Sequence, residues 1–529
     1  MNIHTLGELR ASGYRIRSVK DEMRANLLDK IARREQTFPG IHGYERTVIP
    51  AIHNAVLSRH DIILLGLRGQ AKTRILRSLT ALLDEKIPII EGCEINDSPL
   101  QPTCKRCRRL AAEKGDELPV AWLHREERYR EKLATPDVTV ADLVGDIDPI
   151  KAANQRLTYA DEEVIHYGII PRTNRGIFAI NELPDLAPRI QVALLNILEE
   201  RDLQIRGFPV RIPMDVVLVF SANPEDYTSR GNIITPLKDR IDSQILTHYP
   251  QQIETARRIT EQEAWTERDN RAVIEVPPYL RDLIENIAFV ARGSELVDQS
   301  SGVSARLTIA AMELLQSNLE RRAALTGDRY VFPRLSDFSM LLPAITGKVE
   351  MVYEGEQQGA EVVARKLIGQ AVAKLFESKL PPVERAGTGS RERDRRGYGE
   401  LDQDDLEDMF AGRKTRKTAP KKDDEPRGGG APKGDPAYES ILAWFVEGNK
   451  ITLSDEQPFA DYFRELNRVP KLAETARKHV QPSRDEELAL WMEMILEAMH
   501  QSLRLAREDL DSTITFQELM KFNVLRTVK

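Results

Sequence analysis

The chain has 529 residues, of which 30% are charged and 41% hydrophobic, with a formal net charge of −7. This length is too great for one hydrophobic core and predicts two or three domains. The small net charge offers no basic field for nucleic acid. No apolar run approaches the roughly 20 residues that cross a bilayer, and the start of the chain lacks a signal-peptide pattern, so we expect a cytoplasmic protein.

An N-terminal helical extension is predicted over residues 1–35. Ser18 is the expected N-cap of its main helix, because its hydroxyl can accept a hydrogen bond from a free backbone amide. Met23, Leu27 and Ile31 follow at helical spacing, so we expect them to form its buried face.

Four apolar residues, 62–65, have the length and β-branching of a buried parallel strand, and a glycine-rich loop follows them. Glycines let backbone amides approach phosphates, the Lys72 ammonium can reach the β and γ oxygens of ATP, and the Thr73 hydroxyl can ligate Mg²⁺. Ala71 replaces the second glycine of this pattern, which we expect to be mild because alanine adopts helical dihedrals. An ordinary strand–turn–helix is the alternative. The expected phosphate-binding residues are Gly66, Leu67, Arg68, Gly69, Gln70, Ala71, Lys72 and Thr73.

Residues 93–135 are predicted to be an insertion, and they hold all three cysteines. Cys104 and Cys107 have the spacing of a zinc knuckle, and Cys93 with His124 would complete four ligands for a structural Zn²⁺. Only one of the two cysteine pairs usual in such sites is tightly spaced. Free thiols are therefore the alternative.

Two further apolar strands are predicted, at 176–180 and 216–220, and polar side chains follow each of them. Asn181 and Glu182 come after the first, and Asn223 comes after the second. Since the carboxyl ends of parallel strands share one edge of a sheet, these groups should lie beside the phosphate loop. An acid there can activate water, and an amide can orient it.

Between and beyond these strands the chain is mostly helical. Residues 140–176 predict two short strands, and 188–201 predict a helix with Val192, Leu195 and Leu198 on one face. The expected domains are a nucleotide-binding domain at 36–250, a helical lid at 251–380, a disordered charged linker at 381–435 and a C-terminal helical domain at 436–529.

Four stretches together carry a family resemblance: Gly66–Thr73, Leu143–Asp148, Asn174–Glu182 and Pro236–Ile241. In this order the chain resembles the AAA+ ATPases over about residues 36–350, and within them most resembles the magnesium chelatase ATPase subunit and the MoxR-type ATPases. The resemblance implies an α/β fold in which helices cover both faces of a parallel P-loop sheet. It also implies a helical lid and a separate C-terminal helical domain.

The resemblance also implies roles for single residues. Glu182 would activate the attacking water, Asn223 would orient it, and Asn181 stands where the family has the aspartate beside Mg²⁺. An amide there predicts weaker metal retention and slow turnover. Ile41 matches the segment that lines the adenine pocket, with Tyr44 in place of the family's usual glutamine.

Two arginines imply assembly. Arg240 matches the family's arginine finger, which acts on the nucleotide of a neighbouring subunit, with Arg230 as the nearer alternative, and Arg306 matches the nucleotide-sensing arginine of the lid. A shared site implies a homo-oligomeric ring, most often a hexamer. Chelatase-type ATPases work with a protein that carries a von Willebrand A domain, and the Asp-x-Ser-x-Ser motif of that domain is absent from this sequence. That partner would be a separate protein.

Three functions therefore compete. The first is an ATPase that remodels a partner protein or assists metal insertion. The second is a nucleotide-gated scaffold with little hydrolysis, which Asn181 favours. The third is a transcription activator, which the absence of its Gly-Ala-Phe-Thr-Gly-Ala loop disfavours.

Overall fold

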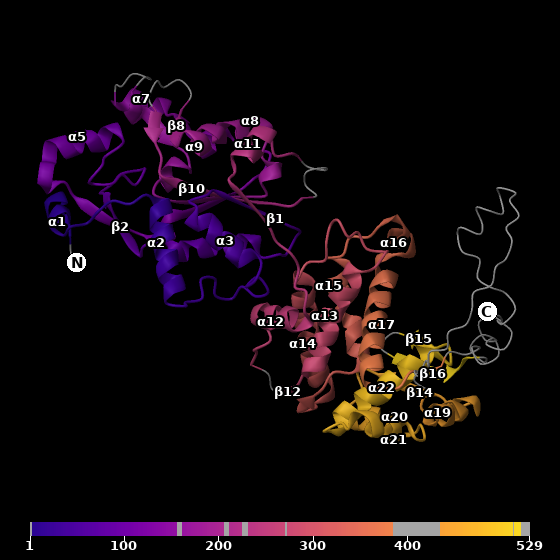
Figure 1. Ribbon diagram of the computed structural model, residues 1–529. Coiled ribbons are helices and arrows are strands. Elements are labelled where there is room, and N and C mark those ends of the chain that lie inside the picture. Colours follow the sequence, from indigo (N-terminus) through magenta and orange to yellow (C-terminus); the bar gives the residue numbers. More distant parts are fainter. Residues whose placement is uncertain are drawn as a thin grey trace, which may run out of the picture. The chain divides into compact units, whose positions relative to one another are not determined.

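The structure, a computed structural model, describes residues 3–155, 161–205, 211–224, 231–269, 272–384, 434–510 and 513–519 (Figure 1). It divides into two compact units, Met1–Gln262 with Asp298–Arg306 and Glu263–Val297 with Leu307–Lys529. Arg230 and most of the predicted 381–435 linker lie outside the described residues. Within the described ranges, no helix is long and apolar enough to cross a membrane.

A five-stranded parallel sheet forms the centre of the first unit. Its order is β11-β1-β10-β7-β4, and every neighbouring pair is parallel. The nucleotide-loop strand β1 therefore lies beside β10, and β10 lies beside β7, as the three apolar segments predict. The strands are β1 (Ile62–Leu65), β4 (Tyr129–Leu133), β7 (Gly176–Asn181), β10 (Val216–Ala222) and β11 (Ser243–Leu246).

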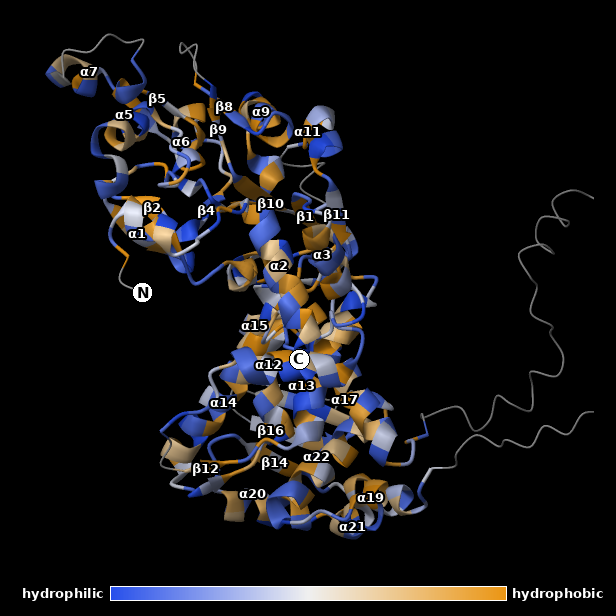
Figure 2. Cartoon of the chain, turned by 60° about the vertical axis from the view of Figure 1, so that its left-hand side comes forward, coloured by the Kyte–Doolittle hydropathy of each residue, from blue (hydrophilic) through white to orange (hydrophobic). Residues whose placement is uncertain are grey.

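Both faces of this sheet are buried. Successive side chains of each strand point to opposite sides, so each strand contributes to two hydrophobic cores. Ile177 and Ala179 of β7 enter one hydrophobic core, which includes residues of α2 (Val19–Ala32), α3 (Val48–Leu57) and α4 (Lys72–Ser78). Phe178 and Ile180 enter the other core. In Figure 2 the helices of both units carry hydrophobic (orange) and hydrophilic (blue) residues together. The predicted α/β class, with helices on both faces of a P-loop sheet, is confirmed.

Helix α2 is part of this unit. The Ser18 hydroxyl caps it by accepting a hydrogen bond from the Asp21 amide, as predicted. Met23 and Leu27 are buried, whereas Ile31 in the last turn is 42% exposed, so the predicted apolar face is one residue too long. The helix is also anchored by a buried ion pair, in which both terminal nitrogens of Arg128 lie 2.7 Å from the carboxylate oxygens of Glu22.

The segment predicted as an insertion is shorter than expected. Strand β2 (Lys86–Ile90) pairs antiparallel with β3 (Val120–His124), and α5 (Lys105–Lys114) lies between them in sequence. Residues 129–133, however, form β4, the edge strand of the central sheet. The insertion therefore ends before Tyr129. Further on, β5 (Gly145–Ile147) and β6 (Ile165–Tyr167) pair as the two short strands expected there, with α7 (Pro149–Gln155) between them.

The helix predicted at 188–201 is broken. It consists of α8 (Pro188–Gln191), a 3₁₀ turn at 192–194 and α9 (Leu195–Glu199). The change of pitch rotates the buried face, so Val192 is 53% exposed and Leu194 is buried. Helix α11 (Thr235–Arg240) and α12 (Ile253–Glu263) follow later.

The second unit is largely helical, as predicted for the lid and the C-terminal region. A small parallel pair, β12 (Val273–Ile274) with β13 (Tyr330–Val331), joins its first helices. A three-stranded antiparallel sheet, which the sequence analysis did not predict, lies among the C-terminal helices. The helices are α13 (Pro278–Arg292), α14 (Arg306–Thr326), α15 (Leu342–Thr346), α16 (Tyr353–Gln358), α17 (Ala360–Lys379), α19 (Ala437–Val446), α20 (Phe459–Asn467), α21 (Leu472–Val480) and α22 (Asp485–Gln501), and the strands are β14 (Ile451–Ser454), β15 (Leu505–Leu510) and β16 (Thr513–Glu518).

A buried polar network joins the predicted lid to the C-terminal elements. Glu493 of α22 accepts hydrogen bonds from the Leu335 amide at 2.8 Å and from the Tyr462 hydroxyl at 2.6 Å. The Arg334 guanidinium lies 4.0 Å from the Tyr462 ring centroid and donates to the Ser454 carbonyl. The C-terminal region therefore packs with the lid in one unit, where the sequence analysis expected a separate domain.

The two chain ends that flank residues 385–433 lie side by side in this unit. The Tyr438 hydroxyl donates to the Pro381 carbonyl at 3.0 Å, and Arg504 Nε donates to the Glu384 carbonyl at 2.9 Å. The Ser502 hydroxyl also donates to the Val383 carbonyl. The residues on either side of the 385–433 segment, Glu384 and Gly434, therefore lie in the same packed region.

Candidate functional site

The predicted phosphate loop connects the buried strand β1 to α4. Lys72 is the first residue of α4 and is only 7% exposed. Its ammonium donates to the Gly66 carbonyl and, at 3.0 Å, to the Leu67 carbonyl. An ammonium that is held over a loop of backbone amides at a helix N-terminus is the arrangement that binds a phosphate chain.

Two glycines of this loop are required by close packing. A Cβ on Gly66 would overlap the hydroxyl of Thr247 and the side-chain oxygen of Gln70. Gly69 has a φ of +72°, and a Cβ there would overlap the Ser304 hydroxyl. Neither position can hold a larger residue without movement of its neighbours.

Ala71 differs from the expectation. It has φ +57° and ψ +18°, which is the left-handed region, and it precedes the first residue of α4. Alanine reaches this region at a cost of about 1–2 kcal/mol, which glycine does not incur. The replacement of the usual glycine is therefore a source of local strain, and the prediction that it is mild was wrong.

Thr73 and Asn181 meet beside this loop. The Thr73 hydroxyl lies 3.3 Å from Asn181 Oδ1, which also accepts a hydrogen bond from the Ser221 hydroxyl at 3.2 Å. Ser221 in turn accepts from the Glu182 amide at 3.3 Å. Oxygen donors at this separation suit Mg²⁺, which prefers hydroxyl, carbonyl and water ligands.

Glu182 occupies the turn directly after β7. Its backbone is left-handed, with φ +56° and ψ +51°, so the strand ends abruptly there and its side chain is half-buried. Asn223 follows the neighbouring strand β10 and is 3% exposed. The parallel register of β7 and β10 brings these two strand ends to the same edge of the sheet.

Glu131 is a residue that sequence reasoning missed. It lies on the edge strand β4, and its carboxylate receives two hydrogen bonds from the guanidinium of Arg77 and one from the Tyr129 hydroxyl. The bonds to Arg77, then the bond to Tyr129 and the nearby Asn181 amide, lower the pKa of Glu131. A carboxylate thus stands next to Asn181. In the sequence, Glu131 is one acidic residue within a polar segment, and nothing there marks it as a functional residue.

The expected adenine-pocket segment is buried near the same loop. Ile41 is 3% exposed, and the Tyr44 hydroxyl lies 3.0 Å from the Gln70 carbonyl and 2.8 Å from the His248 carbonyl. Burial raises the pKa of Tyr44 to about 12. Tyr44 therefore ties the segment to the phosphate loop, a role that its departure from the usual glutamine did not predict.

The two predicted arginines lie on helices. Arg240 ends α11, its side chain is about one-third exposed, and its Nε donates to Glu199 of α9 at 2.6 Å. Arg306 begins α14 and is exposed, and its backbone amide donates a local hydrogen bond to the Ser304 hydroxyl oxygen. Both positions remain predictions as regards nucleotide binding.

The three cysteines gather in the insertion, but the predicted fourth ligand does not join them. Asp97 stands with Cys93, Cys104 and Cys107, and their ligand atoms all lie within 4.8 Å of one another. His124 ends β3, where its ring faces Glu126 and lies 4.0 Å from Glu85. The proposed ligand set therefore changes from His124 to Asp97.

The parallel sheet has a Lys-Thr loop after its second strand in spatial order and polar residues at the ends of the next two strands, which is the arrangement of a P-loop domain. Residues 120–241 match the AAA domain of the dynein-related subfamily. The chain is also 26% identical over 232 residues to the magnesium-chelatase subunit ChlI homolog of Methanocaldococcus jannaschii, and 28% identical over 204 residues to the magnesium-chelatase 67 kDa subunit of Heliobacterium mobile. Residues 120–241 are therefore similar to an AAA domain, and the chain resembles AAA+ subunits of magnesium chelatase.

These matches cover only parts of the chains. They span 42% and 37% of this chain, and 59% and 29% of the respective relatives. A solved complex of subunits BchI and BchD of magnesium chelatase is 19% identical, with a TM-score of 0.32, and the match covers 61% of this chain and 98% of that one.

Proposed function

We propose that this chain binds Mg·ATP at the loop Gly66–Thr73 and hydrolyses it slowly. One observation carries the proposal, namely that Lys72, Thr73 and Asn181 meet where β1 and β7 end, beside Glu182. These are the groups that bind phosphate, hold a metal and activate water, and they come from separate parts of the sequence.

Each group would act on the nucleotide in a distinct way. Lys72 would exchange its bonds to the Gly66 and Leu67 carbonyls for bonds to phosphate oxygens. Thr73 would ligate Mg²⁺ directly, and Asn181 would bind a water of the metal. When bound, Mg²⁺ neutralises the charge that develops on the phosphates.

The attacking water would be handled by the two strand ends. Glu182 would accept its proton, and Asn223 would orient it by a hydrogen bond. Ser221 supports this arrangement, because its hydroxyl bonds both to the Glu182 amide and to Asn181. The abrupt turn at Glu182 then keeps its carboxylate at the edge of the sheet.

Asn181 favours the second candidate function, a nucleotide-gated scaffold. An amide in this position carries no negative charge toward the metal, so ATP can be bound without rapid turnover. Glu131 offsets part of that loss by placing a carboxylate next to Asn181, although the bonds from Arg77 neutralise much of its charge. We therefore rank slow hydrolysis first and the scaffold second.

We further propose that the chain forms a ring, most often a hexamer in such ATPases, and remodels a partner protein or assists metal insertion. The partner would be a separate protein with a von Willebrand A domain. Arg240 would leave Glu199 and reach the γ-phosphate of the neighbouring subunit, and Arg306 would sense the nucleotide. The similarity to magnesium-chelatase subunits supports this proposal.

The binding step is tested with Lys72→Ala and a fluorescent ATP analogue. The variant should lose binding, whereas Lys86→Ala, which changes an exposed lysine at the start of β2, should retain it. Equal affinity in the Lys72 variant and the wild type would remove the basis of the proposal.

The ring is tested separately. Arg240→Ala should lower turnover by about 10³-fold or more with ATP binding nearly intact. Mixing it with Glu182→Gln subunits should restore part of the activity, because some interfaces would then combine an intact arginine with an intact glutamate. A chain that stays monomeric with ATP by light scattering, and shows no rescue, would argue against the ring.

A further inference from the structure

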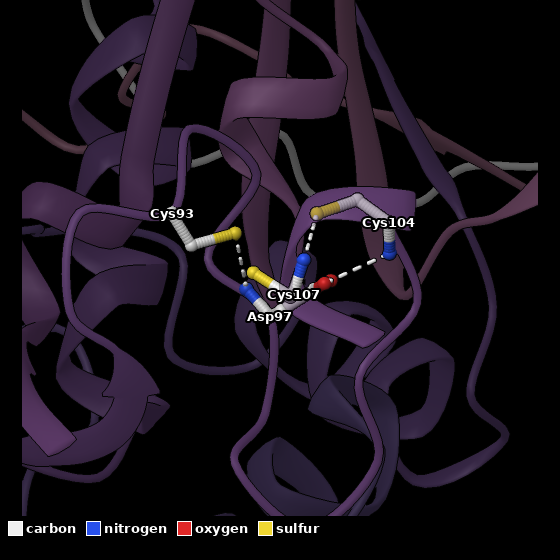
Figure 3. Close-up of side chains that lie close together, drawn as sticks. All are labelled: Cys93, Asp97, Cys104 and Cys107. Carbon is white, nitrogen blue, oxygen red and sulfur yellow. Dashed lines mark hydrogen bonds between the residues drawn. The ribbon is translucent and has the colours of Figure 1, made fainter. Parts of the chain in front are cut away.

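The strongest feature outside the nucleotide site is the cluster of Cys93, Asp97, Cys104 and Cys107 (Figure 3). Cys93 and Asp97 lie in the loop after β2, whereas Cys104 is the N-cap of α5 and Cys107 lies in its first turn. All four are enclosed, with exposed fractions between 0% and 9%. Four potential ligands from two segments thus meet in a site that is closed to solvent.

One oxygen of the Asp97 carboxylate is placed to bind a cation. Its Oδ2 accepts hydrogen bonds from the Thr103 amide at 3.0 Å and from the Cys104 amide at 2.9 Å. Its Oδ1 is buried and, among the described residues, has no hydrogen-bond partner. No ion pair joins Asp97 to a basic side chain in the same ranges. A buried carboxylate oxygen without a partner is costly unless a cation binds it.

The backbone around the sulfurs also suits metal ligands. The Asp97 amide donates to Cys93 Sγ at 3.3 Å, and the Cys107 amide donates to Cys104 Sγ at 3.4 Å. Helix α5, ten residues long, directs its positive end at Cys104. Amide bonds to sulfur and a helix N-terminus both stabilise the thiolate, which is the form that binds metal.

We propose that Cys93, Cys104 and Cys107, through Sγ, and Asp97, through Oδ1, hold one structural Zn²⁺. Tetrahedral Zn–S bonds of about 2.3 Å place two sulfurs about 3.8 Å apart, so the three sulfurs, which lie within 4.8 Å of one another, need to approach by about 1 Å at most. Thiolates select zinc over Ca²⁺ or Mg²⁺. An iron–sulfur cluster would spread the cysteine sulfurs farther apart, because inorganic sulfide and iron lie between them.

The site would brace the insertion against the start of β7. Asn96, within the metal-binding loop, donates to the Arg172 carbonyl at 3.0 Å, and Asn174 donates back to the Ile95 carbonyl at 3.0 Å. Residue 174 lies two positions before β7, the strand that ends in Asn181. The proposed ion therefore has a structural role, with four protein ligands and no open position for substrate.

The primary test is metal analysis of the full chain purified without chelator. It should contain about one zinc per chain, and the three thiols should resist modification until the zinc is removed. Cys107→Ser should lose the metal. His124→Ala should keep the metal, and this variant therefore distinguishes Asp97 from His124 as the fourth ligand.

Asp97→Asn is the variant that addresses the carboxylate. It keeps the shape of the side chain and should weaken zinc in competition with a chromogenic chelator by more than the roughly 10–100-fold that loss of an outer-shell partner costs. Binding of the fluorescent ATP analogue reports independently whether each variant is folded.

Co²⁺ substitution keeps the test decisive if the cysteine variants do not fold. The wild-type chain reconstituted with Co²⁺ should show sulfur-to-metal charge transfer and tetrahedral ligand-field bands. The proposal is overturned by less than a tenth of a zinc per chain with freely reacting thiols, by iron in place of zinc, by an octahedral Co²⁺ spectrum, or by loss of zinc in His124→Ala with retention in Asp97→Asn.

Discussion

The change Asn181→Asp tests the metal side of the nucleotide site. Thr73 Oγ1 lies 3.3 Å from Asn181 Oδ1, so an ion about 2.1 Å from the Thr73 hydroxyl would lie about 4 Å from the new carboxylate, with a water between them. Opposite unit charges at that distance attract by about 4 kcal/mol at an effective dielectric of 20.

Two terms oppose this attraction. Desolvation of the new carboxylate subtracts part of it. The neighbouring Glu131 repels a second negative charge and raises the pKa of the new acid. We therefore expect a net gain of about 1 kcal/mol, which corresponds to about fivefold tighter Mg²⁺ binding.

The assay is a Mg²⁺ titration of ATP hydrolysis at fixed ATP, in parallel with binding of the fluorescent analogue. The midpoint should move several-fold lower in Asn181→Asp, and further in the double variant with Glu131→Gln, because that change removes the repulsion. Glu182→Gln should silence both backgrounds.

The reasoning is refuted if the Mg²⁺ midpoint does not move and Glu182→Gln leaves the rate unchanged. The end of β7 would then not face the nucleotide, and the scaffold would become the better proposal.

Three further changes test the structure. Arg128→Ala should lower the free energy of unfolding in urea by about 3–5 kcal/mol because it leaves Glu22 buried and unpaired, and the double variant Arg128→Met with Glu22→Gln should recover most of that loss. Burial raises the pKa of Glu493 from 4.5 to about 7. Because the pKa is higher in the folded state, this group contributes on the order of 3 kcal/mol of stability below about pH 4.5, and that contribution is lost as the pH rises to about 7. Glu493→Gln should therefore flatten this part of the pH dependence of the unfolding free energy, measured with denaturant. Ala71→Gly should raise the unfolding free energy by at most about 1 kcal/mol, since relief of the left-handed strain is partly offset by the entropy of glycine. Gly69→Ala should abolish binding of the ATP analogue. A large loss of stability in Ala71→Gly, or unchanged binding in Gly69→Ala, would contradict the loop geometry.

The central strands could be predicted from sequence because they are continuous apolar runs buried on both faces. Strand β4 could not, since Glu131 and its polar neighbours give an edge strand no hydrophobic signal. Asp97 could not be predicted as a metal ligand, because sequence spacing does not show which carboxylate a loop turns inward. The strain at Ala71 depends on one backbone angle, which residue type alone does not fix.

The neighbouring chain ends at Glu384 and Gly434 have a consequence for how this protein tolerates cutting and grafting. Proteolysis anywhere in 385–433 would separate the polypeptide into two pieces, yet Glu493 and Arg334 would still hold the C-terminal piece to the lid. Closing a loop costs little more when its length doubles, about 0.6 kcal/mol. Residues 385–433 could therefore be replaced by a short linker, or enlarged by an inserted domain, with little change in the folding free energy of the second unit.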